Sequence, residues 1–323
     1  MPAQVIDIIP IRYYALEFVW KYHITTLSTR YSGLIYFLIG LIIIIKIVIN
    51  KYLYVSVAIV SIQEFVKMAE KKLGKSDVFA SQRVPTGIPG FDELCGGGLL
   101  KNRTYLISGS AGAGKTIFGL QYLYNGITKY GENGIYIATE ERPEQVRENV
   151  KQFGWDFEKL EEEGKLAILD ACSTKIGIPS HEKYVDVRPF DMRNMLDQII
   201  AIQEDIDAKR ALVDGTTSIG FYLNDPSKIR VELLKLSTTL EILGLTSLLT
   251  CEITDENMAS RFGVETFVTE GTILMYYKRT DAVRVRSIEI FKMRGSNHSQ
   301  NLHPYEITSN GIVVHPHEEI YAD

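Results

Sequence analysis

The 323-residue sequence has few cysteines, few tryptophans and no excess of basic charge. Its three cysteines, Cys95, Cys172 and Cys251, are widely spaced and form no Cys-x-x-Cys pair. This pattern excludes a disulfide-rich mini-protein and a cysteine zinc site, and it is typical of reduced thiols in a cytosolic protein. The formal net charge is -5, whereas dedicated nucleic-acid-binding domains are usually basic. Hydrophobic residues at 46% and charged residues at 23% are ordinary for a folded globular chain.

Charge and hydrophobicity are unevenly distributed along the chain. Residues 1–78 hold nine Lys or Arg and five Asp or Glu, a net charge of +4, and the remainder holds 26 and 35, a net of -9. Residues 31–45 contain no charged residue, and the apolar segment continues past Lys46 to residue 49. This length is close to the ~20 residues that span a bilayer. The lysines that follow predict, by the positive-inside rule, a membrane-tethered chain whose remainder is cytoplasmic.

Two other interpretations of this N-terminal segment stay open. Residues 31–49 also fit a buried core helix. Alternatively, the polar stretch that begins at Met68 is the true start, and the segment before it results from a start codon assigned too far upstream. We therefore expect four parts: an N-terminal segment at 1–67 with a transmembrane helix at 31–49 or a mis-assigned start, a linker at 68–79, a globular domain at 80–318 and a tail at 319–323.

Short apolar runs alternate with amphipathic stretches after Asn102. The predicted strands are 105–108, 135–139, 167–170, 211–214, 247–250 and 272–276. The predicted helices are 116–129, 143–153, 189–204 and 226–243. Such an alternation predicts an α/β domain with a mainly parallel sheet flanked by helices. A hairpin with its tip at 280–282 is expected near the C-terminus.

The first predicted strand leads directly into a glycine-rich loop. Its sequence is Gly109-Ser110-Ala111-Gly112-Ala113-Gly114-Lys115-Thr116, a match to G-x-x-x-x-G-K-[ST] between a strand and a helix. The backbone N–H groups of such a loop surround the phosphates of a nucleotide, and the following helix adds its positive N-terminus. Lys115 is expected to reach the β- and γ-phosphates, and the Thr116 hydroxyl to ligate Mg²⁺.

Carboxylates follow two further predicted strands. Asp214 ends the run Ala211-Leu212-Val213, which is the Walker B pattern, and is expected to hold Mg²⁺ beside Thr116. Glu140 and Glu141 come directly after the strand at 135–139. Either can polarise an attacking water, since a general base must lie within hydrogen-bond reach of the proton it takes. From position alone, both can equally well be acidic residues that begin the next helix.

Together with the P-loop, several segments resemble KaiC-like ATPases of the RecA/RadA superfamily. The similar segments are Val84-Pro85-Thr86-Gly87-Ile88-Pro89-Gly90-Phe91-Asp92-Glu93-Leu94, Gly96-Gly97-Gly98-Leu99, Ala138-Thr139-Glu140-Glu141, Asp214 and Phe291-Lys292-Met293-Arg294-Gly295-Ser296-Asn297-His298. The resemblance covers about residues 80–318 and corresponds to one KaiC domain with a RecA-type sheet. KaiC itself carries two such domains.

The resemblance implies properties that the spacing of residues does not. KaiC-type domains usually form hexameric rings with ATP between subunits, so a homohexamer is expected. Glu140 becomes the expected base, with Glu141 supporting it. Lys292 and Arg294 are expected to stabilise γ-phosphate charge in the neighbouring subunit. Ser296 and His298 are expected to lie near the same nucleotide.

The expected function is Mg²⁺-dependent hydrolysis of ATP at subunit interfaces, with a conformational change that acts on an unidentified protein partner. One alternative is a signalling scaffold with autokinase activity, because Thr266 matches an acceptor threonine of KaiC while Glu265 replaces the neighbouring serine. Another is a DNA recombination or repair partner like RadA paralogues. For that role four basic residues flank the hairpin tip: Lys278, Arg279, Arg284 and Arg286. The acidic domain argues against nucleic-acid binding.

Overall fold

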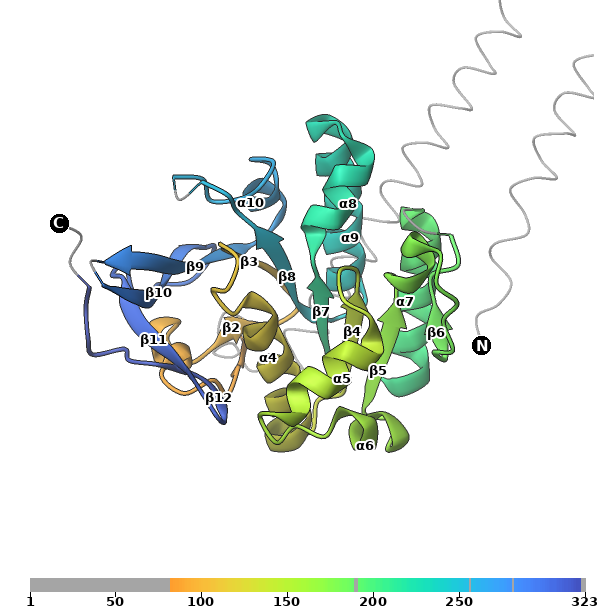
Figure 1. Ribbon diagram of the computed structural model, residues 1–323, viewed down its shortest axis with the longest axis horizontal. Coiled ribbons are helices and arrows are strands. Elements are labelled where there is room, and N and C mark those ends of the chain that lie inside the picture. The colour runs from red at the N-terminus through yellow and green to blue at the C-terminus, as the bar shows by residue number, and fades with distance from the viewer. Residues whose placement is uncertain (1–81, 189–190, 256, 281, 321–323) are drawn as a thin grey trace, which may run out of the picture. The chain divides into compact units, whose positions relative to one another are not determined.

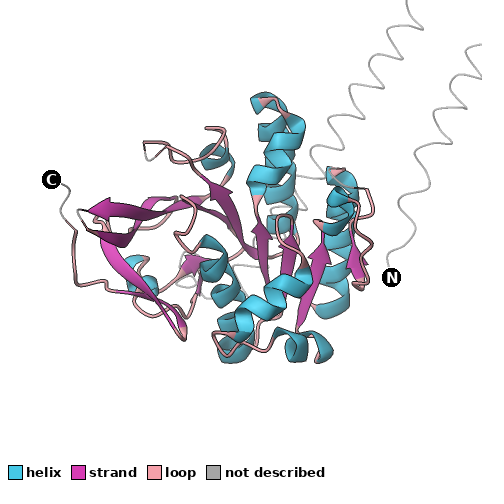
Figure 2. Cartoon of the chain, viewed as in Figure 1, coloured by secondary structure: helices cyan, strands magenta, loops and turns pink. Residues whose placement is uncertain are grey.

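The computed structural model describes residues 82–320, apart from residues 189–190, 256 and 281. Within this part of the chain, ten strands form one sheet (Figures 1 and 2). In spatial order they are β12 (Gly311–Val314), β11 (His303–Thr308), β10 (Val283–Met293), β9 (Gly271–Thr280), β3 (Thr104–Gly109), β8 (Thr246–Glu252), β7 (Arg210–Asp214), β4 (Gly134–Ala138), β5 (Leu166–Asp170) and β6 (Tyr184–Val185). A separate pair joins β1 (Arg83–Val84) to β2 (Leu99–Leu100).

Helices alternate with these strands as the sequence predicts. They are α3 (Phe91–Leu94), α4 (Lys115–Tyr130), α5 (Pro143–Lys151), α6 (Phe157–Glu162), the 3-10 turn η1 (Ser173–Ile176), α7 (Met192–Ile206), α8 (Thr216–Leu223), α9 (Pro226–Ile242) and α10 (Glu265–Val268). The predicted strands and helices are all present, with ends displaced by a few residues. The shorter helices α6 and α8 were not predicted.

The sheet is parallel in its larger part and antiparallel at one edge. Strands β6, β5, β4, β7, β8, β3 and β9 run parallel. Strands β9 to β12 alternate in direction. The expected hairpin is therefore confirmed as β9–β10, and β11–β12 forms a second hairpin that was not predicted.

The central strands are buried on both faces, which explains their continuous hydrophobic runs. Tyr136 of β4 belongs to the core beneath α4, where it lies with Phe118. Its neighbours Ile135 and Ile137 belong to the core on the opposite face, with Ile199 of α7. Successive side chains of one strand thus serve two layers of helices, as the pleat of a strand requires.

Capping residues decide where two of the helices begin. The Asp225 side chain accepts the N–H groups of residues 227 and 228, so α9 begins at Pro226 as predicted. The side chain of Asp191 accepts the N–H groups of residues 193 and 194. Helix α7 therefore begins at Met192, and its predicted start at residue 189 was too early.

The C-terminal hairpin is fastened to the helix that follows the P-loop. The Gln121 side-chain amide of α4 donates to the carbonyl of Ile312 over 3.1 Å, and its oxygen accepts the Ile312 N–H over 2.7 Å. The carbonyl of Ala113 in the P-loop also accepts a hydrogen bond from the Tyr305 hydroxyl of β11. The antiparallel edge of the sheet thereby holds the P-loop and α4 in place.

The predicted transmembrane helix at 31–49, the start at Met68 and the linker at 68–79 lie outside the described residues. In the part of the chain that is described, no helix combines the length and apolar character needed to cross a bilayer.

Candidate functional site: a P-loop at the carboxyl edge of the sheet

The P-loop connects the end of β3 to the start of α4 (Figure 1). Gly112 and Gly114 have φ values of 79° and 93°, which glycine adopts without the strain that a Cβ would cause. Gly114 is the residue before the helix, so the first N–H groups of α4 are not capped by a side chain. Uncapped N–H groups at the start of a helix are suited to binding phosphate.

The first glycine of the loop is required for packing rather than for its φ angle. A Cβ on Gly109 would lie 2.4 Å from the carbonyl oxygen of Met275 in β9. Only glycine lets β3 lie this close to β9 just before the chain turns into the P-loop. The loop is therefore fixed by the sheet at one end and by α4 at the other.

Lys115 points back into its own loop. Its Nζ donates to the carbonyls of Gly109 and Ser110 over 2.9 and 3.1 Å. Burial lowers the pKa of Lys115, and the nearby carboxylates of Glu252 and Asp214 oppose this shift. The site thus contains a half-buried cation near several carboxylates, and this cation can bind a negatively charged ligand.

Asp214 lies at the end of β7 and is almost completely buried. Burial raises its pKa, and hydrogen bonds from the Thr250, Thr116 and Tyr136 hydroxyls lower it again. The structure therefore joins Thr116 and Asp214, the two residues predicted to hold Mg²⁺.

The ends of β4 and β7 are tied together next to Asp214. The Thr139 hydroxyl donates to the Gly215 carbonyl over 2.7 Å and accepts the Gly215 N–H over 2.6 Å. The Thr139 N–H donates to the Asp214 carbonyl over 2.9 Å. These bonds hold Glu140, the next residue, at a set distance from Asp214.

The two adjacent glutamates take different positions. A Cβ on Gly215 would lie 2.8 Å from Oε1 of Glu140, so this carboxylate is directly against the end of β7. Burial raises the pKa of Glu140, as do the charges of Asp214 and Glu252. Glu141 instead turns toward α5, where its Oε2 accepts from Asn149 over 3.4 Å.

A cavity of about 380 Å³ opens beside the P-loop, between α4 and α5. Thr116 and Leu120 line one side, and Glu141, Val150 and Trp155 line the other. The volume is within the range of small-molecule sites. Space for a bound ligand thus exists directly next to the predicted phosphate-binding loop.

The oxygen groups at this edge fit Mg²⁺, which prefers hydroxyl, carboxylate, phosphate and water ligands. Thr116 and Asp214 supply a hydroxyl and a carboxylate that are close enough for the hydroxyl to lower the pKa of the carboxylate. Across the described ranges, no group of three or more His, Cys, Asp or Glu is arranged to hold a metal. A metal here would need phosphate oxygens to complete its coordination, as P-loop sites do.

The predicted trans-acting residues make their contacts away from their own P-loop. Lys292 donates to the carbonyls of Thr266 and Thr269, and burial lowers its pKa. Arg294 is exposed and pairs with Glu270 at 3.4 Å. Lys292 lies near the end of β10, and Arg294 follows its last residue.

Ser296 and His298 lie in the loop that follows β10. The Ser296 hydroxyl donates to the Asn297 carbonyl over 2.8 Å. The Nδ1 atom of His298 bonds with the Ser299 carbonyl over 2.7 Å. No described contact joins this loop to the P-loop of the same chain, so the nucleotide roles of Ser296 and His298 stay predictions.

The segment that matches the KaiC phosphosites is held by Glu265. Its side chain is buried, and its carboxylate accepts the N–H groups of Phe262 and Val264 over 3.0 Å each. This residue therefore has a structural role as a cap of the preceding turn. Thr266 is half-buried, and its carbonyl receives the Lys292 amino group.

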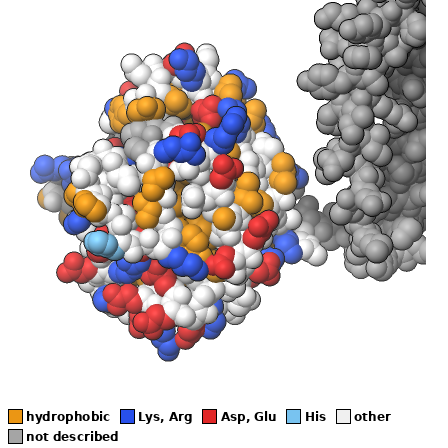
Figure 3. Space-filling model, turned by 90° about the vertical axis from the view of Figure 1, so that its right-hand side faces the viewer, with side chains coloured by type: hydrophobic (Ala, Val, Ile, Leu, Met, Phe, Trp, Pro, Cys, Tyr) orange, Lys and Arg blue, Asp and Glu red, His pale blue; other side chains and the backbone are white. Residues whose placement is uncertain are grey.

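Of the four basic residues on the β9–β10 hairpin, two lie on the side that faces the P-loop. The guanidinium groups of Arg284 and Arg286 lie over the Tyr277 ring, at 5.1 and 4.1 Å. Arg286 also donates to the carbonyl of Gly112 over 3.3 Å. On the side of the domain shown in Figure 3, basic and acidic side chains lie next to one another, so no one-signed surface for a nucleic acid forms there.

Two charged residues that the sequence analysis did not single out join the site. Glu252 ends β8, between the P-loop strand and the Asp214 strand, and its charge raises the pKa of Lys115. Its place after a predicted strand was a usable signal. Lys175 of η1 donates to the Thr139 carbonyl over 3.4 Å, and its charge lowers the pKa of Glu140. It lies in an irregular turn for which the sequence carries no signal.

Comparisons with known proteins agree with this site. Residues 84–319 match the family model described as the KaiC ATPase. A UPF0273 protein of Methanocaldococcus jannaschii is 43% identical over 237 residues, which cover 73% of this chain and 97% of the relative. The circadian clock oscillator protein KaiC of Prochlorococcus marinus strain MIT 9313 is 34% identical over 250 residues, 77% of this chain and 49% of that protein.

A solved structure supports the same assignment. The KaiC-like protein PH0186 of Pyrococcus horikoshii matches with a TM-score of 0.64 and 39% identity, over 73% of this chain and all of the other. Residues 84–319, which the family model matches, contain the P-loop, Asp214, the two glutamates and the loop after β10. The chain belongs to the KaiC ATPase family and carries one KaiC domain.

Proposed function

We propose that this protein binds ATP with Mg²⁺ and hydrolyses it to ADP and phosphate at the interface between subunits of a ring. The observation that carries the proposal is the convergence of Lys115, Asp214 and Glu140 at one edge of the sheet. Phosphoryl transfer to water uses a cation that binds the phosphates, a carboxylate that holds the metal and a group that orients or deprotonates the water, and these three residues match those roles.

The residues of the chain have separate roles in this reaction. The P-loop N–H groups and Lys115 bind the phosphates, and Lys115 exchanges its two backbone carbonyls for phosphate oxygens. Thr116 and Asp214 hold Mg²⁺, which when bound offsets the charge on the phosphate oxygens. Glu140 takes a proton from water as the water oxygen bonds to the γ-phosphorus and the bond to ADP breaks.

A neighbouring subunit completes the site in this proposal. Lys292 and Arg294 lie at the end of β10, and Arg294 is exposed. In the ring, these two side chains reach the γ-phosphate bound by the next subunit, where their positive charges stabilise the transition state as an arginine finger does. Ser296 and His298 would approach the same nucleotide. A hexamer is the assembly that we propose, with the conformational change of hydrolysis acting on a protein partner.

Phosphate release by the full chain and by Lys115→Ala tests the proposal. We expect the variant to lose both ATP binding and hydrolysis, because it lacks the cation that binds the phosphates. Lys129→Ala is a matched control, since Lys129 is exposed on the last turn of the same helix. Equal hydrolysis by wild type and Lys115→Ala would contradict the proposal.

Autokinase activity is a second candidate, and the partial exposure of Thr266 favours it. Thr266 is the second residue of α10 and is followed by the exposed Phe267. Intact mass after incubation with Mg-ATP tests this candidate. A phosphate present in wild type and lost in Thr266→Ala supports it, and an unchanged mass leaves hydrolysis alone.

A further inference from the structure

The glycine run Gly96-Gly97-Gly98 has no role in the proposed chemistry, although it belongs to the family resemblance. Its three residues have φ values of 68°, 108° and 116°. Three consecutive residues in this region require glycine. A Cβ on Gly98 would also lie 2.5 Å from the Val84 carbonyl oxygen. The run therefore brings the chain from α3 to β2 in a tight turn against β1.

The turn surrounds the guanidinium group of Arg83. Arg83 donates through Nη1 to the Cys95 carbonyl and, over 2.8 Å, to the Gly98 carbonyl. Cys95 is the C-cap residue of α3, so its carbonyl lacks a partner within the helix. A Cβ on Gly96 would lie 3.7 Å from Nη2 of Arg83. The two carbonyls of the turn thus hold Nη1 of Arg83 and leave Nη2 free to bond outside the turn.

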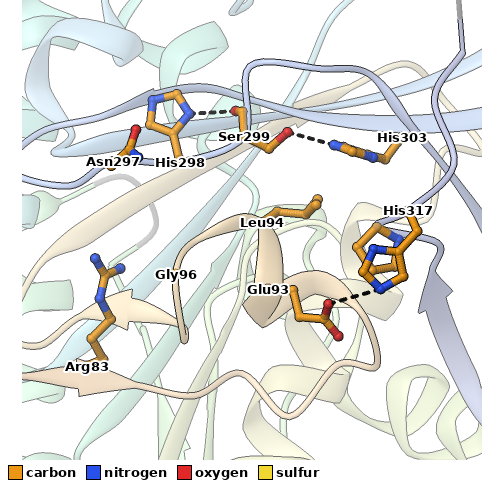
Figure 4. Close-up of a pocket in the computed structure, with 10 residues that line it drawn as sticks. Arg83, Glu93, Leu94, Gly96, Asn297, His298, Ser299, His303 and His317 are labelled. Atoms are coloured by element: carbon orange, nitrogen blue, oxygen red, sulfur yellow. Dashed lines mark hydrogen bonds and ion pairs between the residues drawn. The ribbon is translucent and has the colours of Figure 1, made fainter.

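That second nitrogen reaches the loop after β10. Nη2 of Arg83 donates to the Ser296 hydroxyl over 2.6 Å. Figure 4 shows Arg83 pointing from β1 toward the loop that carries Asn297 and His298, across a cavity of about 470 Å³. The Ser299 N–H donates to the Leu94 carbonyl over 2.8 Å, at the far end of the same loop.

The loop is held at three points. Its first residue, Arg294, donates its N–H to the Glu270 carbonyl over 2.9 Å. Ser296 in the middle is held by Arg83, and Ser299 by the end of α3. Of these three contacts, only the one from Arg83 reaches the centre of the loop, and it is made by a charged side chain.

We infer that Arg83 is a positioning residue for hydrolysis: with the glycine run it sets the conformation of the loop that carries Arg294 and His298 to the neighbouring subunit. The inference rests on the proposed function, because the loop matters for catalysis only if it acts on that neighbour. Arg83 itself touches neither the P-loop nor the Asp214 region. Its loss should change the catalytic step and leave the binding of ATP to the P-loop intact.

Steady-state hydrolysis and ATP binding by Arg83→Ala and Arg83→Lys give the first test. We expect kcat to fall about 10- to 100-fold in Arg83→Ala, since small displacements of catalytic groups cost such factors. The dissociation constant of a fluorescent ATP analogue should change less than about threefold. Arg83→Lys should not restore kcat, because an ammonium lacks the fork that bonds the turn and Ser296 together. Arg103→Ala, which removes an exposed arginine, is the control and should behave as wild type.

Rings that contain both Arg83→Ala and Lys115→Ala subunits distinguish a displaced loop from a general loss of folding. Arg83→Ala has an intact P-loop, and Lys115→Ala has an intact loop after β10. Mixing the two should restore activity above the sum of the separate proteins, because Lys115→Ala subunits supply the loop to Arg83→Ala sites. A mixture that stays at the sum overturns the inference.

Hydrogen exchange tests the positioning without any activity. Amides of residues 294–299 should exchange at least about tenfold faster in Arg83→Ala, as local order is lost, while those of 109–116 stay unchanged. Unchanged exchange of 294–299 overturns the inference. If wild type releases no phosphate, the proposed function fails, and the exchange experiment still decides whether Arg83 orders this loop.

Discussion

Replacing Glu140 with glutamine is the sharpest test of the catalytic assignment. The substitution keeps the size of the side chain against Gly215 but removes its negative charge and its ability to accept a proton. A positioned general base contributes about 10²- to 10⁴-fold to a rate. At about 1.36 kcal/mol for each factor of ten, this corresponds to about 2.7 to 5.4 kcal/mol of activation free energy.

The assay is phosphate release at saturating Mg-ATP, with ATP binding measured separately. We expect Glu140→Gln to lose kcat in that range while it still binds ATP, since the P-loop is unchanged. Glu141→Gln should lose less, because Glu141 turns away from the end of β7 and accepts a hydrogen bond from Asn149 of α5. Glu144→Gln, an exposed glutamate in the first turn of α5, is the control and should match wild type.

The pH dependence gives an independent check. Burial raises the pKa of Glu140, the charges of Asp214 and Glu252 add to this, and Lys115 and Lys175 oppose it. The base works when deprotonated, so activity should fall on acidification at a pH above that of an ordinary glutamate, whose pKa is about 4.3. This acidic limb should be missing from the residual activity of Glu140→Gln. A variant with kcat within about threefold of wild type, or with the same acidic limb, would refute the assignment.

Two further predictions concern stability. Arg210 is fully buried and its Nε lies 2.7 Å from Glu132, so Glu132→Gln should lower the free energy of unfolding by about 3 kcal/mol in urea denaturation, whereas the exposed Glu158→Gln should not change it. Equal stability of the two variants would mean that the other partners of Arg210 compensate its charge. Gly109→Ala should lower the melting temperature by at least about 3 °C, because its Cβ would lie 2.4 Å from the Met275 carbonyl. An unchanged melting temperature would show that β9 can move away.

Periodicity located the central sheet because its strands are buried on both faces. The runs at 135–139 and 211–214 are continuous in apolar residues, and such runs are hard to place anywhere but inside an α/β sheet. The helix N-caps were harder to predict from the sequence. Pro226 marked the start of α9, whereas α7 is capped by Asp191 and has no proline at its first residue. The second hairpin, β11–β12, escaped prediction because its strands are short and only partly buried.

By itself the sequence determined the P-loop, the Asp214 strand end and the KaiC family, since these depend on residue order within one strand–loop–helix unit. Only the tertiary structure decided which glutamate lies against Gly215, and that Glu252 and Lys175 join the site. Only it placed Arg83 on Ser296, 213 residues further along the chain. Such contacts depend on which strands become neighbours in the sheet. The local pattern of a sequence does not specify that order, because pairing energy depends on burial across the whole domain.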